Sequence, residues 1–387
     1  MATTERAEIY TAIAQAKRIV VKIGSSSLVY PNGKMNYRAV ELLVRQLAEL
    51  QNYGKQVVLV SSGAVAAGMG KLKMSTKPTE TGKRQALAAI GQGLLMQVYE
   101  KFFDEYSVNV AQVLLTKDDI AHRERYLNIG NTFSALFEYG IVPIVNENDT
   151  TSFAELRTVG DNDTLAALTA CLVEADLLIL LSDIDGLYTA NPREDENARK
   201  LDVVEEITAG VEDMAGSAGS LVGTGGMATK IAAAKIAGGC GIPMVLADGS
   251  TPEILYKIFD GEPVGTVFMP RERGMVKKKS WLAYGADSCG RIIVDSGALR
   301  ALVKKGSSLL PSGVCSVEGH FDRGDIVAIC GEDNRQLEVA KGFVNYSSAE
   351  IERIKGCQSK CIAEILGKDK DDVDDEIIHR DYMSVKA

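Results

Sequence analysis

The chain has 387 residues, enough for two or three domains of ordinary size. It carries 43 Lys and Arg against 52 Asp and Glu, a net charge of −9, and 46% of its residues are apolar. This composition is typical of a globular protein and argues against disorder, collagen or a coiled coil. The negative balance also disfavours nucleic-acid binding unless basic residues gather locally.

The longest apolar runs, such as 177–181, are far shorter than the roughly 18 residues of a membrane-spanning helix. The first residues, which include Glu5 and Glu8, lack the basic and apolar segments of a secretory signal. We therefore expect a cytoplasmic protein without a membrane partner. The seven cysteines form no Cys-x-x-Cys pair and only three histidines are present, so we expect reduced thiols rather than a metal site.

Apolar stretches of strand length alternate with stretches of helical period through the first two-thirds of the chain. The strands are continuously apolar, which is typical of a parallel sheet covered by helices on both faces. The predicted fold class is α/β, a three-layer αβα sandwich around a mainly parallel sheet. Strands are expected at 18–24, 56–60, 108–115, 141–146, 177–182 and 243–247, and helices at 37–52, 83–105, 125–138, 163–174 and 227–237.

From about Gly290 the pattern changes to short strands separated by Gly, Asp and Ser turns, which predicts a β-rich domain of about 80 residues. Strands are expected there at 291–294, 314–317, 326–330 and 337–343, and a helix at 298–304. The basic stretch 271–279 predicts a linker, and the acidic stretch 368–376 predicts a solvated end. The expected divisions are an extension at 1–17, a larger domain at 18–270, a linker at 271–289, the β-rich domain at 290–368 and an acidic tail at 369–387.

Ligands bind beyond the carboxyl ends of the strands in sheets of this kind, so polar residues there are the candidates for function. The first strand holds Lys22 within an apolar run, followed by Gly24 and three serines. A buried ammonium needs a counter-ion, so Lys22 is expected to face an anion. The alternative is a lysine that reaches water along the strand end. The second strand ends in Ser61 and Ser62, a small turn with free hydroxyls.

Two polar stretches fit a small zwitterionic ligand. After the fourth strand, Asn146 is expected to bond a carboxylate and Asp149 an amino group, although Asx turns would also explain this stretch. Residues 160–164, Gly-Asp-Asn-Asp-Thr, open a helix, and a cap accounts for only one of their polar side chains. Asp163 would then orient ammonium groups on either side of a transferring phosphoryl group, while Asn162 bonds the acceptor.

Two further stretches fit a nucleotide. Ser182 and Asp183 follow the fifth strand, where they would border the nucleotide or form a simple turn. Residues 223–230, Gly-Thr-Gly-Gly-Met-Ala-Thr-Lys, run into a helix and offer backbone N–H groups to a phosphate. Lys230, in the first turn, needs a nearby anion, so we expect a phosphate ligand rather than a lysine on a flexible loop.

Two lysines, an organising carboxylate and a pocket for a small acid together predict phosphoryl transfer. This chemistry depends on positioning and charge neutralisation, so it needs neither a histidine base nor a Ser-His-Asp triad. The sequence contains no Walker A loop and no Gly-x-Gly-x-x-Gly after a strand.

Six segments, in order, resemble the glutamate 5-kinases of the amino acid kinase family: Val-Val-Lys-Ile-Gly-Ser-Ser, Val-Ser-Ser-Gly-Ala-Val, Val-Asn-Glu-Asn-Asp, Val-Gly-Asp-Asn-Asp, Ser-Asp-Ile-Asp-Gly-Leu-Tyr and Gly-Thr-Gly-Gly-Met-Ala-Thr-Lys. Residues 306–311 and 321–325 are similar to PUA domains. The likeness runs from about residue 18 to 367. Ser61 and Ser182 stand where some relatives have Thr, which keeps the hydroxyl.

The resemblance implies ATP-dependent phosphorylation of the γ-carboxylate of L-glutamate, the first step of proline biosynthesis, with Mg²⁺ neutralising the ATP phosphates. It assigns Lys22 and Lys230 to the phosphoryl group, held by Asp163. It implies no side-chain metal ligands. Glutamate would contact Ser62, Asp149 and Asn162, supported by Asn146 and Asp161. ATP would contact Lys22, Ser182, Asp183, Thr224, Gly225, Gly226, Met227, Ala228, Thr229 and Lys230.

The resemblance also implies feedback inhibition by proline and a homodimer or homotetramer. The acidic balance favours a structural or regulatory role for the PUA segment over RNA binding. Other acceptors on the same fold would be aspartate, N-acetylglutamate, carbamate or a nucleotide monophosphate. The amino group expected at Asp149 disfavours N-acetylglutamate.

Overall fold

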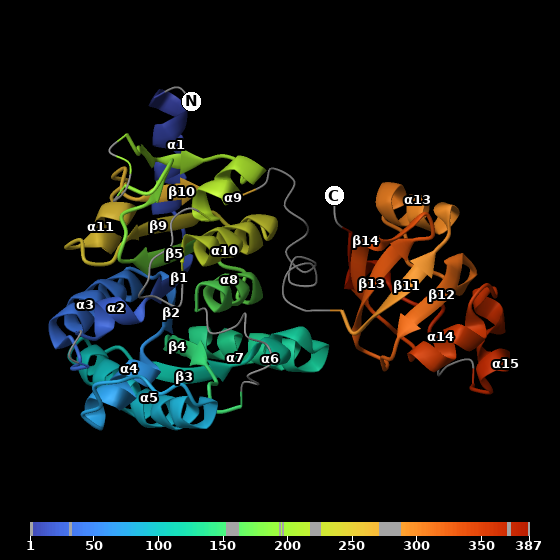
Figure 1. Cartoon of the computed structure of the whole chain (residues 1–387), viewed down its shortest axis with the longest axis horizontal. Helices are drawn as coiled ribbons and strands as arrows, with labels where there is room; N and C mark the ends of the chain where they lie inside the picture. The colour runs from blue at the N-terminus through green and yellow to red at the C-terminus, as the bar shows by residue number, and fades with distance from the viewer. Residues whose placement is uncertain are drawn as a thin grey trace. The chain divides into compact units, whose positions relative to one another are not determined.

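The computed structural model describes residues 3–30, 33–151, 162–192, 195, 197–216, 226–270, 288–369 and 373–385. By internal contacts the chain divides into two compact units, residues 1–116 with 129–274 and residues 117–128 with 275–387 (Figure 1). Most of the predicted linker, 271–287, lies outside the described residues. Within the described part of the chain, no helix is both long and apolar enough to cross a membrane.

The larger unit is built on an eight-stranded sheet in the order β3-β4-β2-β1-β5-β9-β10-β8. The strands from β3 to β9 are parallel to their neighbours, whereas β10 is antiparallel to β9. The predicted α/β fold with a mainly parallel sheet is confirmed. Its strands, in chain order, are β1 (Arg18–Ile23), β2 (Gln56–Ser61), β3 (Val110–Leu115), β4 (Val142–Glu147), β5 (Leu177–Ser182), β8 (Val203–Val204), β9 (Met244–Asp248) and β10 (Thr266–Phe268). A separate two-stranded sheet consists of β6 (Leu187–Tyr188) and β7 (Lys200–Leu201).

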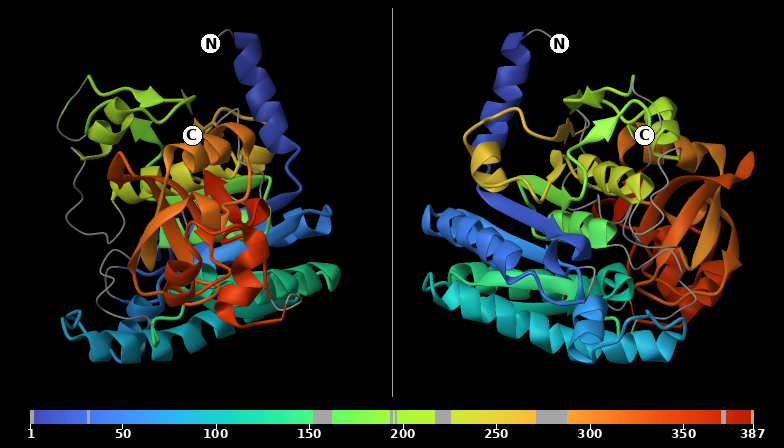
Figure 2. Two further views of the ribbon diagram at one scale, coloured as in Figure 1. Left: turned by 90° about the vertical axis from the view of Figure 1, so that its right-hand side faces the viewer. Right: turned by 60° about the vertical axis from the view of Figure 1, so that its left-hand side comes forward.

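Helices cover this sheet on both faces, as the two views of Figure 2 show. The predicted helices lie close to their expected bounds, and several short ones were not predicted because they span too few turns for a periodic pattern. In chain order the helices up to residue 259 are α1 (Thr3–Ala14), α2 (Ser25–Leu28), α3 (Tyr37–Asn52), α4 (Ala64–Lys71), α5 (Thr81–Asp104), α6 (Lys117–Ala121), α7 (Arg123–Glu138), α8 (Asn162–Leu172), α9 (Ala209–Gly216), α10 (Met227–Gly239) and α11 (Ile254–Phe259).

The alternation of side chains along β1 decides which face of the sheet holds the site. Ile19, Val21 and Ile23 belong to a core that also contains buried residues of α1, α3, α5 and α11. Successive side chains of a strand point to opposite faces, so Lys22 lies on the other face. Helix α8 packs on that face across β1, β2, β4 and β5, and α10 packs against α8. Lys22, on a central strand of the sheet, therefore lies on the face that α8 and α10 cover.

Two helices of the other layer approach each other closely because of a glycine. A Cβ added at Gly91 of α5 would overlap the carbonyl oxygen of Ala64, the first residue of α4. Helix α4 itself follows Gly63, whose φ of 101° is in the region that favours glycine. The tight turn after β2 and the close packing of α5 thus depend on these two glycines.

The N-terminal extension, for which the sequence predicted no structure, forms a helix, and two cysteines of the larger unit differ from expectation. Helix α1 occupies most of the unassigned extension, and its Tyr10 and Ile13 are buried in the main core. Cys171 of α8 and Cys240, which follows α10, form a disulfide, so the prediction of reduced thiols is wrong for this pair. The two lie 69 residues apart, and spacing alone does not reveal such a pair.

The smaller unit has its own five-stranded sheet, in the order β12-β11-β13-β14-β15. Ile377 and Ile378 are fully buried in its core and β15 pairs with β14, so the expected acidic tail is wrong from residue 377 onward. The six acidic residues of 368–376 suggested a solvated end, so the burial of Ile377 and Ile378 was not predicted. The elements are β11 (Gly290–Val294), α13 (Ser296–Lys305), β12 (Val314–Gly319), β13 (Ile326–Gly331), β14 (Asn334–Phe343), α14 (Ser348–Ile354), α15 (Ile362–Leu366) and β15 (Met383–Val385), with short 3₁₀ helices at Pro311–Gly313, Ser359–Cys361 and Arg380–Tyr382.

The close approach of α4 and α5 predicts opposite effects for two glycines of one helix. Gly91→Ala should lower the free energy of unfolding by at least about 2 kcal/mol, because the new methyl group meets backbone. Gly93→Ala should raise it by about 0.5 kcal/mol, because nothing lies within 4 Å of the new Cβ and alanine favours the helix. Urea unfolding of both variants measures the difference, and equal effects would contradict the packing described.

Candidate functional site

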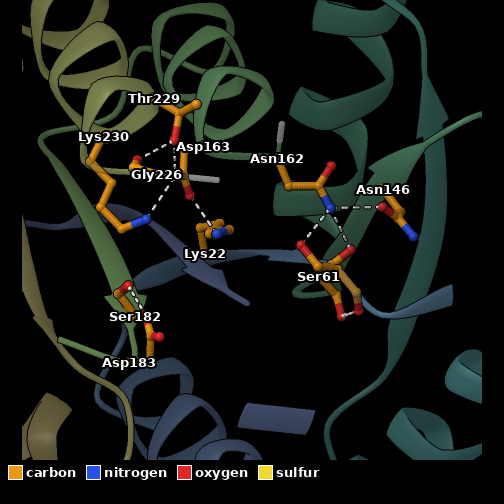
Figure 3. A network of polar contacts seen from close by, with 11 residues as sticks. Lys22, Ser61, Asn146, Asn162, Asp163, Ser182, Asp183, Gly226, Thr229 and Lys230 are labelled. Carbon is orange, nitrogen blue, oxygen red and sulfur yellow. Dashed lines mark hydrogen bonds and ion pairs between the residues drawn. The ribbon is translucent and has the colours of Figure 1, made fainter. Parts of the chain in front are cut away.

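Three charged residues that are far apart in the sequence meet at the carboxyl edge of the sheet (Figure 3). Lys22 comes from β1, while Asp163 and Lys230 come from the first turns of α8 and α10. The Asp163 Oδ1 atom pairs with the Lys22 ammonium, and its Oδ2 atom lies 3.2 Å from Lys230 Nζ. All three side chains are buried. One carboxylate thus bridges two ammonium groups in a part of the protein with little water.

The two lysines keep the Asp163 carboxyl group ionised. Burial alone would raise the pKa of Asp163, but Lys22 and Lys230 outweigh burial and lower its pKa below the ordinary value. The carboxylate therefore stays ionised at neutral pH. Because two positive charges share one negative charge, the cluster keeps a net positive charge and attracts an anion.

The start of α10 is tied to the start of α8. The Thr229 hydroxyl lies 3.0 Å from Asp163 Oδ2 and 2.7 Å from the carbonyl oxygen of Gly226. Lys230 stands in the first turn of a helix, where a positive charge is unfavourable unless an anion is near. Asp163 is that anion, so part of the charge balance that the sequence required comes from the protein itself.

A second cluster, of neutral groups, lies beside the first because Asn162 precedes Asp163. The Asn162 Nδ2 atom donates to Ser62 Oγ at 2.8 Å, to the Ser61 carbonyl at 3.1 Å and to Asn146 Oδ1 at 3.0 Å. These partners stand at the ends of β2 and β4. Two adjacent residues of α8 therefore hold two different sets of groups, one charged and one neutral.

Helix α5 contributes two residues that sequence reasoning missed. Gln92 Oε1 accepts a hydrogen bond of 2.8 Å from Asn146 Nδ2, and the Tyr99 hydroxyl lies 2.8 Å from Ser61 Oγ. Burial raises the pKa of Tyr99, and its hydrogen bond to Ser61 opposes this. Gln92 shares a helix face with the buried Leu95 and Tyr99. A polar residue on an otherwise apolar helix face could have indicated Gln92 as a functional residue.

Three more predicted residues, Ser182, Asp183 and Asp149, lie at or just after the ends of β5 and β4 and outside these bonded networks. Ser182 is buried at the end of β5 and donates to Asp183 Oδ1 at 3.0 Å. Burial raises the pKa of Asp149, against the opposing charges of Arg84 and Lys77. Among the described residues, no hydrogen bond joins the Asp149 side chain to Asn162 or Ser62.

Only the end of the predicted phosphate loop falls among the described residues. Asp161, Thr224 and Gly225 lie outside the described residues. Gly226 precedes α10, whose first residues are the buried Met227 and the exposed Ala228.

The site offers few ligands for a metal. Over the described ranges, no group of three or more His, Cys, Asp or Glu side chains is arranged to hold an ion. Asp163, the buried carboxylate of the site, is already paired with two lysines. Mg²⁺ prefers several oxygen ligands and keeps much of its water, so it would be held here mainly by oxygens of a bound phosphate.

The description "Amino acid kinase family" fits residues 17–248, and "PUA domain" fits residues 290–366. A glutamate 5-kinase of Thermoanaerobacter sp. (strain X514) is 52% identical over 368 residues, which covers 95% of this chain and 97% of that protein. The chain belongs to the amino acid kinase family, among the glutamate 5-kinases. The family membership expected from the sequence is confirmed, and with it the expected PUA domain.

A second relative agrees over a similar length. A glutamate 5-kinase of Carboxydothermus hydrogenoformans is 55% identical over 373 residues, 96% of this chain and 98% of its own. Among solved structures, a UMP kinase from Ureaplasma parvum aligns over 66% of this chain and 99% of its own, with 16% identity and a TM-score of 0.46.

The bridging carboxylate predicts a large and pH-dependent loss of stability in Asp163→Asn. At pH 7 the free energy of unfolding should fall by about 3 kcal/mol, because two buried ammonium groups lose their counter-ion. The pKa of Asp163 is lowered in the folded state, so its stabilisation exists above the unfolded pKa of about 4 and is lost as the pH falls below it. The difference between wild type and variant should therefore shrink in acid.

The exposed pair of Glu80 and Lys83 supplies the control for this measurement. Glu80→Gln makes the same carboxylate-to-amide change on the surface, where ion pairs contribute little. Urea midpoints that shift equally in the two variants would show that the Asp163 cluster is not a buried ion network.

Proposed function

We propose that this chain catalyses ATP-dependent phosphorylation of the γ-carboxylate of L-glutamate, giving ADP and L-glutamyl 5-phosphate. The observation that carries the proposal is the Asp163 bridge between Lys22 and Lys230, which lies next to the amide cluster of Asn162. A positive phosphate site and a hydrogen-bonding acceptor site thus adjoin along one helix terminus. The near-full-length similarity to proteins named glutamate 5-kinase supports the same reaction.

Lys22 and Lys230 would contact the transferring phosphoryl group, with Asp163 keeping the two ammonium groups in place. Charge builds on the phosphoryl oxygens and the leaving oxygen in the transition state, and two fixed cations stabilise it without having to reorganise. The rest of the nucleotide would lie along the adjoining turns: Ser182, Asp183 and the run Thr224, Gly225, Gly226, Met227, Ala228, Thr229.

Glutamate would bind on the other side of Asn162. Ser62 and Asn162 would contact glutamate, with the Ser62 hydroxyl suited to its γ-carboxylate. Asn146 and Asp161 would support them, and Asp149 would hold the α-ammonium. An oxygen of the γ-carboxylate attacks the γ-phosphorus as the bond from that phosphorus to the β,γ-bridging oxygen breaks, and ADP leaves with that oxygen. A carboxylate is already ionised at neutral pH, so the step moves no proton and needs no general base.

Mg²⁺ would accompany ATP and neutralise its phosphate charge. We also propose, from family membership, that the product feeds proline biosynthesis, that proline inhibits the enzyme and that the protein forms a homodimer or homotetramer. Proline keeps the α-carboxylate and the ammonium of glutamate, so its inhibition would be competitive with glutamate if it uses the same groups.

The reaction predicts a specific product that can be trapped. With ATP, Mg²⁺ and L-glutamate, hydroxylamine should give a hydroxamate whose formation depends on glutamate, because acyl phosphates react readily with this nucleophile. N-acetylglutamate should support much slower formation, because its amino group can no longer pair with Asp149. Absence of glutamate-dependent hydroxamate, or faster reaction of the acetylated acid, would refute the proposed acceptor.

The proposed role of Lys230 predicts a catalytic loss without a comparable loss of structure. Lys230→Ala should lower kcat/KM at least tenfold, because one of the two cations on the phosphoryl group is removed. Lys235→Ala is the matched control, since Lys235 is on the same helix but pairs with Glu212 at 2.6 Å away from the cluster. Steady-state rates of the two variants decide the point, and near-normal turnover of Lys230→Ala would contradict the role.

A further inference from the structure

The buried face of α5 reaches the acceptor site through a side chain that has no role in the reaction above. Gln92 Oε1 accepts a 2.8 Å hydrogen bond from Asn146 Nδ2. Asn146 is 3% exposed, so this amide has almost no water to bond instead. A buried amide group left without a partner costs about 1–3 kcal/mol. Gln92 therefore provides what the Asn146 NH₂ group needs.

The direction of the hydrogen bonds around Asn146 follows from this contact. An amide side chain can be turned by half a rotation, which exchanges its donor and its acceptor. The backbone N–H of Glu147 donates to Asn146 Oδ1 at 2.9 Å, and Asn162 Nδ2 donates to the same oxygen at 3.0 Å. In the turned arrangement the Asn146 NH₂ group would face these two donors. Gln92 stabilises the arrangement in which Asn146 Oδ1 faces the two donors, because Gln92 accepts a hydrogen bond from the Asn146 NH₂ group on the opposite side.

The orientation of the Asn146 amide also sets the orientation of the Asn162 amide, which contacts Ser61 and Ser62. The Asn162 NH₂ group donates to Asn146, to the Ser61 carbonyl and to Ser62 Oγ. Within the described ranges no hydrogen bond reaches the Asn162 side-chain oxygen. The Ser62 oxygen is then an acceptor, so its own hydrogen remains available to donate. A hydroxyl that must donate is suited to a carboxylate ligand.

Helix α5 supports the turn at a second point. Tyr99 lies seven residues after Gln92, nearly two helical turns, and therefore on the same face. Ser61 Oγ bonds the carbonyl oxygen of Ser62 at 3.1 Å, so its bond with the Tyr99 hydroxyl is one in which the tyrosine donates. Gly91, next to Gln92, permits α5 to approach the first residue of α4 closely. The helix thus holds both ends of the amide cluster.

We propose that Gln92 is a positioning residue that fixes the direction of the hydrogen bonds from Asn146 through Asn162 to Ser62, and thereby prepares the Ser62 hydroxyl to donate to the carboxylate of the acceptor. This role rests on the glutamate kinase activity proposed above. It concerns the acceptor half of the site, since the hydrogen bond of Gln92 among the described residues goes to Asn146 and not to the lysine cluster.

The test replaces the acceptor oxygen while keeping the length of the side chain. Gln92→Met removes the strong acceptor but preserves an unbranched chain with good helix propensity. The KM for glutamate should rise about tenfold or more, while the KM for ATP stays within twofold, because the ammonium pair is untouched. Gln92→Glu retains an acceptor oxygen and should recover most of the loss in glutamate KM.

Two controls separate positioning from a general loss of structure. Gln97→Met makes the same change at an exposed position of α5 and should leave both KM values at the wild-type level. In a double-mutant cycle with Asn146→Ala, Gln92→Met should add little further loss, since its effect passes through that amide. Gln92→Ala replaces Gln92→Met in the cycle if the methionine variant does not fold.

The outcomes are distinct. A Gln92→Met enzyme with wild-type glutamate KM, equal rises in both KM values, or fully additive effects with Asn146→Ala would overturn the positioning role. A wild-type enzyme without glutamate-dependent activity would overturn the proposed function, and this role with it. The proposal is supported if Gln92→Met raises the glutamate KM selectively and Gln92→Glu recovers most of the loss. Gln92→Met must also add little further loss when Asn146→Ala is already present.

Discussion

The bridge from Asp163 to Lys22 and Lys230 is the constraint on which the rest of the site depends. Two ammonium groups so deeply buried repel each other and are costly without a counter-ion, and one carboxylate cannot neutralise both. The protein therefore carries a positive cluster of defined geometry that is completed by an anionic ligand. Three elements are fixed relative to one another by this requirement: the central strand β1 and the first turns of α8 and α10.

The position of α8 also links this cluster to the acceptor site. Asp163 and Asn162 are neighbours, so the orientation that places the carboxylate between the lysines also places the amide beside Ser62 and Asn146. Helix α5 supports the amide cluster from the opposite face of the sheet, through Gln92 and Tyr99. The disulfide joins the distal parts of the α8 and α10 segments, far along the helices from Asp163 and Lys230. The lysine cluster and the amide cluster are thus both held in place by α8.

Much of this arrangement could be predicted from the sequence. Continuous apolar strands predicted the parallel sheet, and polar residues after each strand located the edge where Lys22, Asn146 and Ser182 now lie. Lys230 in a helix start predicted a phosphate ligand, which stays a prediction, and the structure shows the anion Asp163 beside it. The prediction of the sheet succeeds because it depends on a local rule, the run of apolar residues along each strand.

The features that could not be predicted depend on tertiary contacts. The disulfide joins residues of two helices that only the fold brings together. Ile377 and Ile378 are buried because a strand from the chain end completes the small sheet, which the acidic residues before them concealed. Gln92 was a polar residue on an apolar face, and its meaning depends on Asn146 lying opposite it.

The most direct test of the account is a crystal structure of the protein with ADP, Mg²⁺, aluminium fluoride and L-glutamate. The aluminium fluoride group mimics the phosphoryl group in flight between ADP and the acceptor carboxylate. Lys22 Nζ and Lys230 Nζ should both bond fluorine atoms of this group while Asp163 remains between them. A structure in which either ammonium group is turned away, or in which Asp163 has left the lysines to bind Mg²⁺, would contradict it.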